Sequence, residues 1–186
     1  MPILKFINIQ WLLFWGFLMV LLPGYSQVGT YTFSQTVGTY SEIPTASATV
    51  AYTAPWDNHT NGSVYQATLP FTFLYDGNPY TSCFISPNGF LIFGSTQPAS
   101  TLYAPLSNTA VFSGAVCGMG FDLISNGSDI TYTTLGTSPN RIFVVQYKNA
   151  VRKGTDAGNF NFQIRLSETS NTIEFSYGHC APEGTT

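Results

Sequence analysis

The feature of the sequence that most constrains the fold is a strict alternation of apolar and polar residues near its C-terminal end. Residues 159–178 read NFNFQIRLSETSNTIEFSYG, in which two runs of period two flank the polar stretch Glu168–Asn171. Because successive side chains of a strand point to opposite faces of a sheet, this pattern predicts an antiparallel hairpin with one buried face. We expect its Phe, Ile and Leu side chains to form core, and Gln163, Arg165 and Glu174 to face solvent.

Similar short runs, separated by turn signals, follow one another through the preceding sequence without a helical period. Asn88-Gly89, between two apolar runs, is the strongest local hairpin signal, and Pro44 and Pro55 limit residues 41–54 to an edge strand or loop. The expected strand runs lie at 31–35, 69–75, 80–86, 90–93, 130–135 and 141–147, the last apolar on both faces as in a central strand. The sequence therefore predicts an all-β domain, an antiparallel β-sandwich, with a jelly-roll variant as the alternative.

The first 26 residues have the order of a secretory signal peptide. A positively charged Lys5 precedes the apolar run 11–22, and the small residues Gly24 and Ser26 precede the expected cleavage point. The run is shorter than the roughly 20 residues of a membrane-spanning helix, which favours a cleaved signal over an anchor. We therefore predict a signal peptide at 1–26, a β-sandwich domain at 27–180, and at 181–186 the start of a linker or a truncated continuation.

The low charge of the chain argues against two classes of partner, nucleic acids and anionic membrane surfaces. Only 8% of residues are charged, with six Lys and Arg against nine Asp and Glu and a net charge of −3. Nucleic-acid binding depends on many phosphate contacts from Lys and Arg, and anionic membrane surfaces also attract clustered cations. We expect neither nucleic-acid binding nor a membrane span after signal cleavage, and we expect the protein to be secreted or on the outer cell surface.

The sequence does not decide whether any of its three cysteines, Cys83, Cys117 and Cys180, form a disulfide bond. Secretion would permit disulfides, yet an odd number at wide spacing does not form a disulfide framework. Cys83 lies inside a strand-like run and is expected to be a small core residue. One pair among the three remains an alternative, because a sequence does not give the distance that a bridge requires.

Five segments of the chain occur in a recognisable order and spacing, namely YTFSQTVGTYSEI, WDN, LPFTFLYDGNPYTSCFISPNGFLIFG, GTSPNRIFVVQYKNA and the hairpin at 159–178. Together they are similar to the N-terminal β domain of large surface proteins exported by type IX secretion in gliding Gram-negative bacteria. The second half is also similar, more distantly, to the nidogen-type extracellular domain, which shares the FQ-x-x-L-x-E and I-E-F-x-Y hairpin.

The resemblance implies a module of a larger polypeptide. Members of the surface-protein family are described as adhesins, carry further β modules downstream, and have no established activity for this domain. This chain departs from the family where a Trp-Asp-Asp motif is common, since residues 117–122 read CGMGFD and keep only Asp122. We expect further domains of the same polypeptide.

Residues for catalysis are scarce in this sequence. The GxSxG, HExxH, P-loop and dinucleotide-binding patterns are missing, and the Asp156-Ala157-Gly158 triplet is better explained as a loop. A glycosidase needs two carboxylates that face each other across a groove, and nothing in the sequence pairs the acids in this way. We therefore predict a protein that is not an enzyme.

One candidate ligand-binding site surrounds Trp56, the single tryptophan outside the predicted signal peptide. It lies in a loop-like stretch beside Asp57 and Asn58, and an exposed tryptophan ring can stack on a sugar. Tyr65 extends the same platform. The favoured interpretation is nevertheless that Trp56 is buried and closes one end of the sandwich, because most tryptophan surface is buried in folded domains.

A second candidate site would bind calcium. Asp122, Asn126 and Asp129 lie within FDLISNGSD and offer the hard oxygen ligands that Ca²⁺ prefers. The alternative is a polar turn in which Asn126-Gly127 adopts positive φ and the acids face water. The spacing matches no EF-hand loop, so calcium is the only cofactor considered and the turn is the favoured interpretation.

Together these features predict a non-catalytic module of a secreted or cell-surface protein that serves adhesion or ligand binding. Its expected ligand is an extracellular glycan or a surface protein, bound by loops at one end of the sheets. Two alternatives remain from other classes. One is a structural spacer domain, and the other is an accessory domain of an extracellular carbohydrate-active enzyme.

Overall fold

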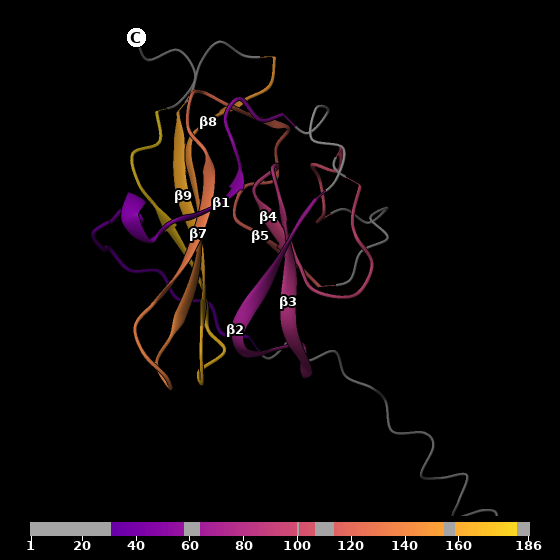
Figure 1. Cartoon of the computed structure of the whole chain (residues 1–186), viewed down its shortest axis with the longest axis vertical. Helices are drawn as coiled ribbons and strands as arrows, with labels where there is room; N and C mark the ends of the chain where they lie inside the picture. The colour runs from indigo at the N-terminus through magenta and orange to yellow at the C-terminus, as the bar shows by residue number, and fades with distance from the viewer. Residues whose placement is uncertain (1–30, 58–63, 100, 107–113, 155–158, 182–186) are drawn as a thin grey trace, which may run out of the picture. The chain divides into compact units, whose positions relative to one another are not determined.

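The structure, a computed structural model, describes residues 31–57, 64–99, 101–106, 114–154 and 159–181. The predicted signal peptide at 1–26 lies outside these residues, as does the Asp156-Ala157-Gly158 triplet. Residues 34–186 form a compact unit distinct from residues 1–33, and the fold described below belongs to this larger unit. It consists of two antiparallel sheets, so the prediction of an all-β sandwich is confirmed (Figure 1).

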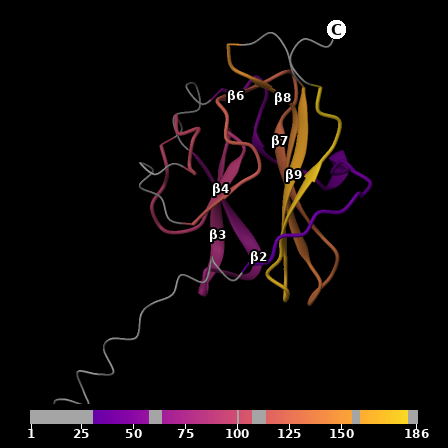
Figure 2. The same cartoon turned by 180° about the vertical axis from the view of Figure 1, so that it is seen from behind.

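The first sheet, called sheet A, contains the predicted hairpin at one side. Its order is β1-β7-β8-β9-β10, and β6 pairs with the far part of β8 (Figure 2). The central position of β8 confirms the expectation for the doubly apolar RIFVVQY run. The strands are β1 (Thr49–Tyr52), β6 (Leu123–Ser125), β7 (Ile130–Leu135), β8 (Ile142–Arg152), β9 (Phe160–Ser167) and β10 (Ile173–Tyr177).

The second sheet, sheet B, has the order β2-β3-β4-β5. Gly89, with φ of 84°, lies in the turn between β3 and β4, where the sequence predicts a hairpin, whereas Asn88 does not take positive φ. The strands are β2 (Tyr65–Tyr75), β3 (Asn78–Ser86), β4 (Phe90–Ile92) and β5 (Ala115–Cys117). The described helical structure is a single 3-10 turn, η3 (Thr45–Ser47).

The core lies between the two sheets. Sheet A supplies the inward residues of β8 and β9, and sheet B supplies those of β2 to β4. The ring of Tyr147 stacks on that of Phe162 with centroids 4.5 Å apart, and the Tyr147 hydroxyl donates a hydrogen bond to the Ser86 carbonyl across the two sheets. Period-two burial thus produces one continuous apolar layer, which is the main stabilising feature of the fold.

The predicted hairpin is confirmed, with its Phe and Ile side chains on the core face. β9 and β10 pair without a register shift, from Ile173 opposite Leu166 to Tyr177 opposite Phe162. One strand prediction is wrong, because residues 31–35 form no strand. A short alternating run becomes a strand only when a neighbour pairs with it, and no described strand does so here.

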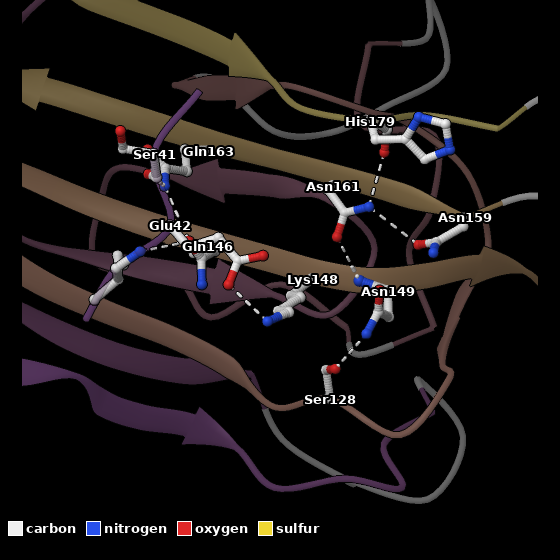
Figure 3. Close-up of polar contacts among 11 residues, drawn as sticks. Ser41, Glu42, Ser128, Gln146, Lys148, Asn149, Asn159, Asn161, Gln163 and His179 are labelled. Atoms are coloured by element: carbon white, nitrogen blue, oxygen red, sulfur yellow. Dashed lines mark hydrogen bonds and ion pairs between the residues drawn. The ribbon is translucent and has the colours of Figure 1, made fainter. Parts of the chain in front are cut away.

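The outer face of sheet A is crossed by residues 40–48, which we call the strap. Ile43 N–H donates to Gln146 Oε1 at 2.8 Å, and Gln163 Nε2 donates both to the Ser41 carbonyl and to Gln146 Oε1 (Figure 3). Gln146 is 5% exposed and Gln163 is 1% exposed. The prediction that Gln163 faces solvent is therefore wrong, since its amide satisfies backbone groups of the strap.

The strap is held at both of its ends. The ring of Tyr40 packs over Gly178, where an added Cβ would come within 2.8 Å of the ring, so this contact requires glycine. At the other end the Thr133 hydroxyl donates to the Ser47 carbonyl at 2.7 Å. At its surface Glu42 pairs with Lys148 at 2.6 Å. Polar groups, more than apolar ones, attach this segment to the sheet.

The outer face of sheet B is apolar instead. Val64, Phe84, Phe90 and Ile92 form a second buried cluster there, and Leu102 packs against it. The three cysteines are free thiols, and Cys83 is buried as expected, so no pair among them is bridged in this structure. Within the described residues, no helix is long and apolar enough to cross a membrane.

Candidate functional site

Three segments that are distant in the sequence meet where β8 ends. They are residues 54–57, 121–129 and 149–153, and we call this region the loop end. An isolated antiparallel bridge joins Asp57 to Ile124, and β6 runs beside the last residues of β8. The two candidate sites of the sequence, around Trp56 and within FDLISNGSD, are therefore one place in the structure.

Trp56 anchors this region from inside. It is 1% exposed, and its indole Nε1–H donates to the Ser128 carbonyl at 2.8 Å. Its own carbonyl accepts from Ser125 N–H at 2.9 Å. The structure agrees with the favoured interpretation, a buried ring that closes this end of the sandwich, and the ring is not available for sugar stacking, because it gains more by burial against the core than by facing water. Trp56 instead fixes the 54–57 segment against the β6–β7 turn.

Asp57 carries the charged part of the loop end. Its carboxylate receives two contacts from Lys153 Nζ, at 2.9 and 3.2 Å, and the side chains of Asp57 and Lys153 are 27% and 34% exposed. The Lys153 N–H also donates to the Asp122 carbonyl at 2.8 Å. Lys153 thus links the segment that contains Asp57 to the segment that contains Asp122. Its side chain and that of Asp57 stay partly accessible to solvent.

The turn between β6 and β7 is held by hydrogen bonds to neighbouring segments. Asp129 Oδ1 accepts from Ala54 N–H at 2.7 Å, and Asn126 N–H donates to the carbonyl of Asn149. Asn149 has φ of 50° at an irregularity in the β8–β9 pairing, a conformation that asparagine tolerates better than most residues. Its side chain donates to Ser128 Oγ at 2.8 Å (Figure 3). The turn is polar, and its geometry is set by the bulged strand beneath it.

An aromatic side chain and a guanidinium lie at the same end. The guanidinium of Arg152 is 5.2 Å from the ring centroid of Phe121, within the range of a cation–π contact, and Phe121 is 42% exposed. Arg152 and Lys153 are adjacent in sequence, and both follow the β8 core positions. The loop end therefore presents an exposed ring with the guanidinium of Arg152 over it, together with the ion pair of Lys153 and Asp57.

The remaining residues of the predicted ligand site lie elsewhere or outside the description. Tyr65 begins β2, its hydroxyl is 3.0 Å from that of Tyr132, and its ring packs near Tyr52. No contact links it to Trp56 among those the described residues make. Asn58 lies outside the described residues. Of the proposed platform, Trp56 is buried, Asp57 lies at the loop end, and Tyr65 is a partly buried residue of β2.

The predicted calcium ligands are near one another in the chain but differ in their surroundings. Asp129 uses one carboxylate oxygen for Ala54 N–H, while Asn126 is exposed and Asp122 is half-buried. In the described part of the chain, no group of three or more His, Cys, Asp or Glu side chains could hold a metal ion. Gly127 has φ of 79°, as a polar turn requires.

Large pKa shifts occur away from the loop end. Burial raises the pKa of the Cys83 thiol to about 12, so this thiol is neutral at physiological pH. Burial likewise raises the pKa of Tyr52 to about 12. The Arg141 guanidinium, bonded at 2.6 and 2.8 Å, lowers the pKa of Glu168 from 4.5 to about 2. This pair lies where β8 begins, at the opposite end of the strand from Lys153.

Sequence reasoning missed Lys153, Arg152 and Phe121 as members of the site. The available signal was the position of the two adjacent cations directly after a long apolar strand. Lysine and arginine at the end of a buried strand necessarily face the loops at that end. Nothing in the sequence indicated which other loops would meet them there.

Comparisons with known proteins give one family and no individual relative. A model of the family described as NIDO related matches residues 30–186. No curated protein and no solved structure matches the chain.

Proposed function

This chain belongs to the NIDO-related family of extracellular domains, and from this premise we propose that it is a non-catalytic module that binds an extracellular ligand through its loop end. The ligand class that we propose is an extracellular glycan or a surface protein. The module would serve adhesion as part of a larger polypeptide.

The single observation that carries this proposal is the convergence of three loops on one surface. Phe121 offers an exposed ring, and Lys153 with Asp57 offers a charged pair that is partly accessible. An aromatic face with flanking charges and amides suits a polar ligand that also has apolar faces, as sugars and protein loops do. The rigid sheets beneath hold this surface in place.

The chemistry of the described residues supports a binding role over a catalytic one. A nucleophile or general base needs a pKa suited to neutral pH, whereas the buried thiol of Cys83 has a pKa of about 12. Lys153 and Asp57 pair with each other, and an ion pair of this kind suits recognition. Binding is therefore the function that we assign to these groups.

Delivery to the cell exterior is the second part of the proposal. The apolar run 11–22, followed by Gly24 and Ser26, supports a cleaved signal peptide, and the likeness to exported bacterial surface proteins supports the type IX route. N-terminal sequencing of the exported protein tests this part. We expect the mature protein to begin at Gln27, and a retained Met1 would contradict it.

A glycan and matrix-protein array tests ligand binding. We expect the purified protein to bind at least one class of spot, and Phe121→Ser to weaken that signal by about tenfold, the effect of roughly 1.4 kcal/mol. Val50→Ser is a matched control, because Val50 is 43% exposed, against 42% for Phe121, but lies on β1. Binding that both variants lose equally would contradict a site at the loop end.

The alternative function is a structural spacer without a ligand of its own. The observation that favours it is that Trp56, the side chain with the largest apolar surface at the loop end, is buried. Complete silence of the wild-type protein on the array would support the spacer and reject the binding module.

A further inference from the structure

The edge strands of the two sheets differ in how they are protected. A sheet edge presents unpaired backbone groups, and proteins commonly blunt it with bulges, prolines or very short strands. β1 has a register shift between Val50 and Tyr52, and β2 has a shift between Thr68 and Phe73 and contains Pro70. β5 has three residues, and β6, which pairs with the end of β8, also has three. Each of these edges carries a device that opposes pairing with another strand.

β10, the remaining edge of sheet A, carries none of these devices. It pairs with β9 over its full length of five residues without a register shift, and it contains no proline or lysine. Among the strands that the structure describes, none pairs with its outer side. β10 is thus the one described edge that is regular enough to receive another strand.

The register fixes which backbone groups face outward. Ser167 N–H donates to the Thr172 carbonyl, and Gly178 N–H donates to the Asn161 carbonyl. Hydrogen-bonded pairs alternate along an antiparallel ladder, so the even-numbered residues 172–178 bond to β9. Ile173, Phe175 and Tyr177 consequently direct their N–H and carbonyl groups away from the sheet.

The side chains of the same residues are apolar and accessible. Phe175 is 37% exposed and Tyr177 is 52% exposed, although both lie on the core side of sheet A. The Tyr177 hydroxyl donates to the Gly118 carbonyl at 2.7 Å, which holds its ring over the rim of the core beside Phe162. An outward backbone and an exposed aromatic row together form a surface that another strand would cover.

We propose that β10 pairs with β10 of a second copy of this chain, antiparallel and about a two-fold axis. The occupant follows from the strand's own sequence, because the register centred on Phe175 pairs every residue of β10 with its copy and brings no like charges together. With Phe175 opposite the partner's Phe175, Ile173 faces the partner's Tyr177 and Glu174 faces the partner's Ser176. This register pairs all five residues and forms roughly six backbone hydrogen bonds.

The neighbouring registers are less favourable. Moving the axis to residue 174 would place Glu174 directly opposite the partner's Glu174, and like charges at that position destabilise a strand pair. Moving it to residue 176 would leave Ile173 unpaired. In the centred register Glu174 keeps its own partner, since Arg165 Nε lies 3.6 Å from its carboxylate.

The resulting interface is small, so the dimer is expected to be transient. A single short strand pair falls below the roughly 1,200 Å² that is typical of stable complexes. Association should therefore be visible at about 0.1–1 mM protein, or where many copies share one surface.

Sedimentation of the full chain, as the expressing cell delivers it, tests the proposal. We expect wild-type protein to dimerise across this concentration range, and Phe175→Lys and Phe175→Glu each to remain monomeric. An equimolar mixture of these two variants should dimerise again, since opposite charges then face each other at the axis. Val50→Lys, on the bulged edge β1, is the matched control and should dimerise like wild type.

Amide chemical shifts give a second measurement that needs no substitution. Raising the concentration should shift the signals of residues 173–177 and leave those of β1 unchanged. A monomeric wild-type protein would overturn the proposal, as would a mixture that stays monomeric or a Val50→Lys variant that loses association. A silent ligand array would not affect this result, because the loop end contributes no residue to the β10 pairing.

Discussion

In two regions of this molecule, the strap and the loop end, polar side chains join segments that are distant in the sequence, but the two regions differ in how far those side chains are buried. At the outer face of sheet A, the amides of Gln146 and Gln163 are almost fully buried and bond to the strap (Figure 3). At the loop end, Lys153 and Asp57 also join distant segments, yet both side chains keep about a third of their surface in solvent. The first region is closed by its own chain, while the second remains open.

The difference shows how polar groups can be assigned to stability or to recognition. A buried amide with its hydrogen bonds complete has nothing left for a ligand, and its removal exposes unsatisfied backbone groups. A partly exposed ion pair contributes little to stability but can exchange its partner for a ligand. The two regions should therefore respond oppositely to substitution, and each prediction below tests one side of this contrast.

The largest effect is expected from Trp56→Ala, at the base of the loop end. We expect a loss of about 3–5 kcal/mol in the free energy of unfolding, because a buried aromatic ring is replaced by a cavity. Trp56→Phe should recover most of this, losing about 1 kcal/mol for the hydrogen bond to Ser128. Denaturant unfolding measures both. A loss below about 1 kcal/mol for Trp56→Ala would show that the ring is not part of the interior.

Gln163→Leu should have the next largest effect. It removes the donor to the Ser41 carbonyl and should cost about 1–3 kcal/mol, together with faster hydrogen exchange at Ile43 N–H. Gln66→Leu is a control on exposed β2 surface and should stay within about 0.5 kcal/mol of wild type. If both variants behaved alike, the outer face would not be closed by the strap.

These two residues mark the limit of what the sequence predicts. Alternation in residues 159–178 was sufficient to predict the hairpin and its core face, because burial of apolar surface needs no particular partner. The same alternation placed Gln163 in solvent, and that prediction was wrong. Gln163 is covered by the strap, whose Ser41 carbonyl accepts its hydrogen bond and lies more than a hundred residues earlier in the chain. The residue type alone does not predict such a distant partner.

The candidate site was predicted in part for a similar reason. Asp57 and the turn at 122–129 were singled out separately, and a bridge to Ile124 brings them together. For Trp56, the favoured interpretation of a buried ring agrees with the structure, and the competing exposed sugar platform does not. Loop polarity can be read from residue types, whereas the meeting of loops depends on strand order, which the sequence did not provide.

Acid should weaken the end of sheet A opposite the loop end. Because the pKa of Glu168 is lowered to about 2, its ion pair with Arg141 contributes stability above pH 4.5, and this contribution is lost as pH falls from 4.5 through 2. Glu168→Gln should flatten the dependence of unfolding free energy on pH in this window. An unchanged slope in the variant would assign the acid sensitivity to other groups.

The smallest effect on stability is expected from Lys153→Ala. A partly exposed ion pair contributes about 0–1 kcal/mol, so the midpoint of denaturant unfolding should hardly change. Lys148→Ala, which breaks the pair with Glu42 at the surface of the strap, should be equally mild. A loss above about 2 kcal/mol for Lys153→Ala would mean that the loop end is part of the structural frame.

The most direct test of a binding site at the loop end is to compare the ligand affinity of Lys153→Ala, at the loop end, with that of Lys148→Ala, at the strap. For a ligand found on the array, we expect Lys153→Ala to lower the affinity by about tenfold or more and Lys148→Ala to change it by less than about twofold. Lys148 lies within β8 and Lys153 directly follows it, and both lysines are ion-paired, so charge loss alone does not distinguish them. Equal loss in both variants, or a loss confined to Lys148→Ala, would contradict a binding site at the loop end.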